Sequence, residues 1–181
     1  MKRTFLLTAI TLTSLFSFSQ NDLQVSLSGI GALKLNMSIA EVEKVTGQKI
    51  NTKLSKGAED YAMDTVKINF KGAPVEIIFY NQYIEEKKFE VSVYAITSSS
   101  PLCKTKSGIA IGDDKMKIVT TYDTFYMEIA PYFEDAGNEQ YKPNKTRSTV
   151  TIHGQDENGV IIFNLNNNKV ASFTVSIFEG C

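Results

Sequence analysis

The stretch Ala32-Leu33-Lys34-Leu35-Asn36-Met37-Ser38 decides the fold, because Gly108-Ile109-Ala110-Ile111-Gly112-Asp113-Asp114 repeats its character in the other half of the chain. Each stretch is a short apolar turn that ends in a helix-capping residue. A short helical pattern and then alternating apolar and polar residues follow each of them. This order predicts an α+β fold of two tandem repeats. In each repeat a short helix would pack on one face of an antiparallel β-meander, and the meanders would form a continuous or two-lobed curved sheet.

The first 19 residues are typical of a bacterial secretory signal peptide. Lys2 and Arg3 precede an apolar run over residues 5–18, which is too short and too rich in Thr and Ser to span a membrane well. The small residues of Ser17-Phe18-Ser19 predict cleavage near Ser19, and an uncleaved anchor is the alternative. The ending also resembles signal peptides of Bacteroidota, which implies a periplasmic or secreted protein without an integral membrane span after cleavage.

The mature chain is expected to contain a first αβ repeat at residues 20–100 and a second at 101–181, joined by the polar segment Ser98-Ser99-Ser100-Pro101. Removing the basic signal residues takes the formal net charge from -1 to about -3. No basic run is longer than Lys87-Lys88, so the charge pattern argues against nucleic acid as a partner.

The two cysteines, Cys103 and Cys181, bracket the second repeat. In an oxidising compartment an even pair predicts a disulfide, which would stabilise the fold by about 4 kcal/mol in the chain-entropy model. The alternative is two free thiols. A metal site would need ligands that this pair lacks.

Local signals place the helices and strands. Ser38 and Glu41 form a capping box and Gly47 is a left-handed stop, while Asp113 or Asp114 is expected to cap the second helix. Strands are expected at 23–28, 61–70, 75–80, 89–96, 125–132, 149–153, 160–165 and 170–178. Tight turns are expected at Asn158-Gly159 and at 166–168, and polar loops at 81–88 and 134–148.

Side-chain alternation predicts one uncovered, tyrosine-bearing face of the sheet, because the helices would cover the other face. Interfaces favour tyrosine, since its body is apolar and its tip is polar. The expected partner-binding residues are Ile78, Tyr80, Tyr94, Tyr126, Tyr132, His153 and Ile162, and the same phase also places Ile96 outward. The alternatives are that these tyrosines pair with one another on a solvated sheet, or that the N-terminal segment covers them.

No residue pattern predicts a catalytic centre, a metal site or a cofactor. His153 is the only histidine, and no Cys or Ser lies beside it in the sequence. Asp156-Glu157-Asn158-Gly159 lacks the spacing of a calcium loop, and Gly29-Ile30-Gly31 lacks the third glycine of a phosphate-binding loop.

The repeated pattern resembles the tandem αβ repeats of the β-lactamase inhibitory protein and of small outer-membrane assembly lipoproteins. Leu33, Leu35, Met37, Ser38 and Val42 carry the resemblance in the first repeat, and Ile109, Ile111, Gly112, Asp114 and Ile118 carry it in the second. The chain departs from that pattern at Asn36 and Asp123, where glycines are usual, and neither repeat has a disulfide of its own. The resemblance implies the architecture and a non-enzymatic binding role, without naming a target.

Three classes of function remain. The leading hypothesis is a secreted or periplasmic module that binds another protein through its uncovered sheet face, as an inhibitor, a toxin-immunity protein or a component of envelope assembly. A carrier that holds a small ligand or a peptide in a cleft between the lobes is the first alternative. An enzyme of unknown type is the second.

Overall fold

The structure is a computed structural model of the chain, and it describes residues 22–54, 62–85, 88–135, 141–154 and 159–178. The segment predicted as a signal peptide, 1–19, and Cys181 lie outside these residues. Within them the fold is α+β and consists mostly of strands. It contains a seven-stranded antiparallel sheet, a small mixed four-stranded sheet and two short helices.

The two halves of the chain share the larger sheet and meet at its β6–β11 pair. The strand order is β4-β5-β6-β11-β10-β9-β8. At the junction, Ile96 of β6 lies opposite Val175 of β11, so the apolar core is continuous from one half to the other. The strands are β4 (Met63–Phe70), β5 (Ala73–Glu85), β6 (Lys88–Ser98), β8 (Met127–Asp135), β9 (Tyr141–His153), β10 (Gly159–Asn166) and β11 (Lys169–Ile177).

The smaller sheet joins the beginnings of the two halves. It has the order β3-β2-β1-β7, and β1 pairs with β7 in parallel through Val25 and Thr105. Its strands are β1 (Gln24–Ser26), β2 (Gly29–Ile30), β3 (Leu33–Lys34) and β7 (Lys104–Thr105).

Capping residues determine where the helices begin and end. In α1 (Ile39–Thr46), the Ser38 hydroxyl accepts from the backbone N–H of Glu41, whose carboxylate accepts from the backbone N–H of Ser38 at 2.8 Å. Gly47 ends this helix with a φ of 67°, so both predicted signals are confirmed. In α2 (Lys115–Thr121), Asp114 accepts from the N–H of Met116 at 2.8 Å.

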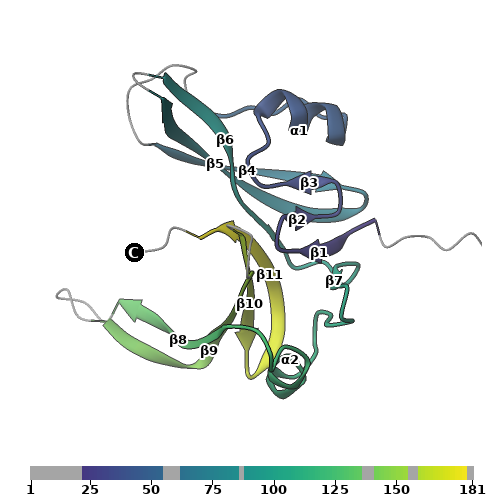
Figure 1. The fold of residues 1–181 in the computed structure, drawn as a ribbon, viewed down its shortest axis with the longest axis vertical. Helices are drawn as coiled ribbons and strands as arrows, with labels where there is room; N and C mark the ends of the chain where they lie inside the picture. The colour runs from purple at the N-terminus through teal and green to yellow at the C-terminus, as the bar shows by residue number, and fades with distance from the viewer. Residues whose placement is uncertain (1–21, 55–61, 86–87, 136–140, 155–158, 179–181) are drawn as a thin grey trace, which may run out of the picture.

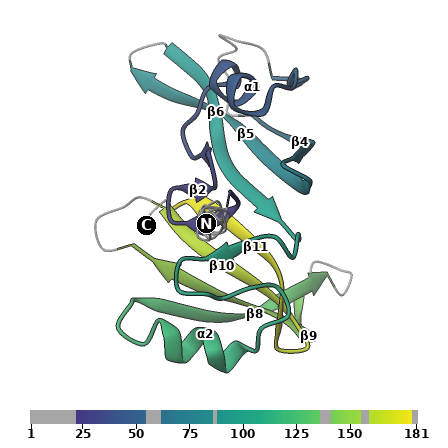
Figure 2. The ribbon, with the colours of Figure 1, turned by 90° about the vertical axis from the view of Figure 1, so that its right-hand side faces the viewer.

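Both helices and the smaller sheet lie on the same side of the seven-stranded sheet (Figures 1 and 2). Val42 of α1, Ile118 of α2 and Leu33 of β3 are fully buried there. They belong to one hydrophobic core together with Phe79 and Phe163 of the larger sheet. Among the described residues, this one-sided arrangement leaves the opposite face of the sheet without a helix.

The two halves have similar element orders, but the structure does not show them to be tandem repeats. Each half has a short helix followed by antiparallel strands. The first half contributes β4, β5 and β6 to the sheet, whereas the second contributes β8, β9, β10 and β11.

Both segments expected to be polar loops are mostly strand. β5 extends to Glu85 and β6 begins at Lys88, while β8 extends to Asp135 and β9 begins at Tyr141. Backbone hydrogen bonds join neighbouring strands, so polar side chains do not prevent long hairpins from forming. The expected turn at 166–168 is confirmed, because Asn167 and Asn168 have positive φ angles of 50° and 60°. The expected turn at Asn158-Gly159 falls on residue 158, which lies outside the described residues.

The outward placement of Ile96 is wrong. The β5–β6 register shifts between Ile78 and Phe79, which indicates a β-bulge. An extra residue in one strand reverses the side-chain phase beyond it, so Ile96 pairs with Ile77 and is fully buried.

The predicted disulfide is not present. Cys103 is a free thiol that is fully buried in the hydrophobic core, and burial raises its pKa. A buried protonated thiol behaves as a small apolar side chain.

Candidate functional site

The candidate site is the sheet face opposite the helices, which we call the open face. Figure 1 shows the strands of the first and second halves diverging on this side. The strand registers place the following described residues on it: Lys67, Glu76, Ile78, Tyr80, Ala95, Thr97, Glu128, Thr151, His153, Val160, Ile162, Asn164, Ser172, Thr174 and Ser176.

The centre of the open face is a row of small polar side chains across the junction of the two halves. Thr97 and Thr174 share a hydroxyl–hydroxyl hydrogen bond of 2.9 Å. The Asn164 amide donates to Thr174 at 3.0 Å and to Ser172 at 3.1 Å. These groups bond to one another and carry no charge, so a partner can approach without displacing an ion pair there.

Tyr80 and Tyr94 form the first aromatic group of the open face. Their ring centroids lie 5.6 Å apart with an edge-to-face angle of 71°. Tyr94 occupies the irregular part of β6, between the pairs Phe79–Val93 and Ile78–Ala95, and the bulge brings its ring against Tyr80. Ile78 lies two residues before Tyr80 on β5, on the same face, and it is half-buried.

The second aromatic group surrounds His153 at the end of β9. Its ring lies 4.7 Å from the Tyr126 ring and 4.6 Å from the Phe178 ring, between centroids. His153 is only 7% exposed, whereas Tyr126 is 65% and Phe178 is 48% exposed. The outer rings therefore cover the imidazole and are themselves available to a partner.

Glu128 is the acidic residue beside this second group. Its carboxylate accepts a hydrogen bond of 3.0 Å from the Tyr126 hydroxyl, and that bond together with the negative charge raises the pKa of Tyr126. The Nε2 atom of His153 lies 3.8 Å from the same carboxylate, which is too far for a hydrogen bond, and Nε2 is buried without a hydrogen-bond partner. A covered imidazole is poorly placed to exchange protons with a substrate.

The structure brings some of the predicted binding residues together and separates others. It pairs Tyr80 with Tyr94 and Tyr126 with His153, and Ile162 lies half-buried between Thr151 and Thr174. Tyr132 is at the other end of β8, where the Arg147 guanidinium lies 3.9 Å from its ring centroid.

Sequence reasoning did not single out Phe178 as a binding residue, although a signal for it is present. Ser172, Thr174 and Ser176 alternate onto the open face, and the same period continues to Phe178.

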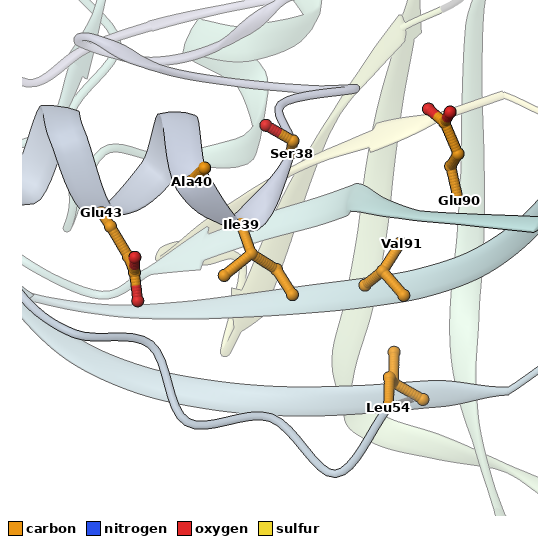
Figure 3. A pocket seen from close by; sticks show the side chains of 7 residues that line it. All are labelled: Ser38, Ile39, Ala40, Glu43, Leu54, Glu90 and Val91. Carbon is orange, nitrogen blue, oxygen red and sulfur yellow. The ribbon is translucent and has the colours of Figure 1, made fainter. Parts of the chain in front are cut away.

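A pocket of about 380 Å³ lies elsewhere, between α1, Leu54 and β6 (Figure 3). It belongs to the first half of the chain. It is therefore not the cleft between lobes that a carrier was expected to use.

Comparisons with protein-family models, curated proteins and solved structures give no match to this chain. The resemblance to the inhibitory-protein and assembly-lipoprotein repeats therefore stays a prediction. Within the described ranges, neither helix is long and apolar enough to cross a membrane, and no group of three or more His, Cys, Asp or Glu side chains could hold a metal ion.

Proposed function

We propose that this chain is a secreted or periplasmic protein-binding module that docks another protein on the open face. The observation that carries the proposal is the pairing of two aromatic groups with an uncharged polar centre on the face that neither described helix covers. Interfaces favour such a composition, because aromatic side chains supply most of the binding energy and small polar groups permit close approach.

The exposed rings supply the expected anchors. Tyr126 and Phe178 present large apolar surfaces, and Tyr94 adds an aromatic edge across the sheet. Inhibition, toxin immunity and envelope assembly all fit this kind of docking. The identity of the partner would distinguish them.

Replacing Tyr94 and Tyr126 together with alanine is expected to reduce partner capture at least about tenfold, because each change removes an aromatic anchor. The measurement is quantitative affinity capture from the envelope and secreted fractions of the native cell. The matched control is Leu102→Ala with Met116→Ala, which removes exposed apolar surface away from the open face and should leave capture unchanged.

Circular dichroism and urea unfolding of both double variants would establish that each remains folded. Recovery of the same partners in the same amounts by the tyrosine variant would contradict the proposal. So would an equal loss with the control pair.

A further inference from the structure

Glu128 is an acidic residue of the open face that has no basic partner among the described residues. Lys67 and Glu76, on the same face, neutralise each other across 2.7 Å between the ammonium nitrogen and a carboxylate oxygen. The Glu128 carboxylate forms no such ion pair with a Lys or Arg of the described ranges. Its side chain is 52% exposed, so a cation that arrives from outside can reach it.

The groups beside Glu128 hold its carboxylate without neutralising the charge. The Tyr126 hydroxyl donates to Oε1 at 3.0 Å, which fixes that oxygen beside the tyrosine ring. The Nε2 atom of His153 lies 3.8 Å from the same oxygen, which is beyond hydrogen-bond distance, and it is buried without a hydrogen-bond partner. This corner of the open face therefore has a fixed negative charge with an unused nitrogen beside it.

Two exposed aromatic rings lie at the same corner. Tyr126 and Phe178 both pack on the His153 ring, and each leaves about half or more of its own surface exposed. Ring faces attract cations, and guanidinium groups stack on them. The rings also reduce the contact of the neighbouring carboxylate with water, which strengthens its attraction for a cation.

An arginine already stacks on a tyrosine elsewhere on this strand. The Arg147 guanidinium carbon lies 3.9 Å from the ring centroid of Tyr132, near the far end of β8. Tyr126, just before β8 begins, has the more exposed ring, and no Lys or Arg of the described residues lies over it. The chain therefore supplies an acceptor for a second arginine but not the arginine itself.

We propose that the partner docked on the open face contributes an arginine at this corner, with its guanidinium stacked on the Tyr126 ring and hydrogen-bonded to the Glu128 carboxylate. The inference rests on the proposed docking function and specifies the chemistry of the partner. A guanidinium fits better than an ammonium, because its planar fork can bond to a carboxylate while its face covers an aromatic ring.

The test uses the mature chain, aromatic NMR and blocked single amino acids as probes. Titration with N-acetyl-arginine methylamide is expected to shift the ring signals of Tyr126 and Phe178 in a saturable way. The citrulline analogue has nearly the same shape without the charge, so it should bind several-fold more weakly. The lysine analogue should fall between the two, and added salt should reduce the advantage of arginine over citrulline.

Charge variants separate pairing with Glu128 from general attraction to the acidic chain. Glu128→Gln should abolish the preference for arginine over citrulline, and Tyr126→Leu should weaken the binding of the arginine probe several-fold. Glu76→Gln is the matched control, since it removes one negative charge from the same face at the ion pair with Lys67 and should leave the preference unchanged.

Equal affinity for the arginine and citrulline probes would overturn the proposal, as would tighter binding of the lysine probe. Equal loss of the preference in Glu128→Gln and Glu76→Gln, or an absence of ring shifts, would also overturn it. These results leave the docking function standing, because its own test is capture by the Tyr94→Ala, Tyr126→Ala protein. Unchanged capture by that protein, together with an arginine preference in the probe titrations, would instead contradict the docking function.

Discussion

Replacing Phe163 with alanine is expected to lower the free energy of unfolding by about 3–5 kcal/mol, because the change leaves a cavity between α2 and the larger sheet. Phe163 is fully buried on β10. Its ring centroid lies 5.8 Å from that of Tyr122, which ends α2, and 5.5 Å from that of Phe173 on β11. Urea unfolding followed by circular dichroism would measure the loss.

Phe125→Ala provides the control for this prediction. Phe125 also packs edge-to-face on Tyr122, at 5.5 Å, but it is 39% exposed and can be replaced with less loss of buried area. We expect a cost below about 1.5 kcal/mol for this variant. Equal costs for the two phenylalanines would show that Phe163 is not a central contact between α2 and the sheet.

Replacing Gly159 with alanine is expected to cost about 3 kcal/mol, near the upper end of the usual range for overpacked sites. An added Cβ would lie 2.0 Å from the Leu27 carbonyl oxygen and 3.3 Å from the Leu35 side chain. Backbone atoms cannot move aside as a flexible side chain can, so the smaller sheet would have to shift away from β10. The shift would be measured by hydrogen exchange at β1 and β2 and by urea unfolding.

Gly72→Ala is the comparison for Gly159→Ala. Gly72 has a φ of 81° and nothing within 4 Å of an added Cβ, so its cost comes from backbone strain alone. We expect about 1–2 kcal/mol for Gly72→Ala, without loss of exchange protection in β1 and β2. Unchanged protection of those strands in the Gly159 variant would contradict the close contact with Leu27.

Local signals in the sequence predicted the parts of the fold that depend on neighbouring residues. Ser38 with Glu41 and Asp114 with Met116 are bonded within one helical turn, so the residue types alone indicate the helix starts. Gly47, Asn167 and Asn168 adopt positive φ angles, and these too follow from the residue types, because glycine and asparagine tolerate such angles.

Features that depend on distant parts of the chain could not be predicted in this way. The bulge opposite Phe79 reversed the expected direction of Ile96, and register errors of one residue exchange the two faces of a strand. The sequence singled out Gly159 as a turn residue, whereas the structure shows that the Leu27 carbonyl, far away in the chain, leaves no room for a larger side chain there.

The sequence predicted which face of the sheet carries the candidate site, but it did not predict which side chains contact one another there. Alternation placed tyrosines on one face, and the structure pairs Tyr80 with Tyr94 there. Alternation also extends to Phe178, but it does not show that the Tyr126 and Phe178 rings pack against the His153 ring, which depends on how the strands are placed in space.

The most direct test of the docking account is site-specific photo-crosslinking in the native cell. A photoreactive residue would replace Thr174, in the centre of the open face, or Lys115, at the start of α2 on the covered side. If a partner protein docks on the open face, the photoreactive residue at position 174 is expected to give a discrete crosslinked protein and the one at position 115 none. Crosslinks from position 115 alone would contradict it.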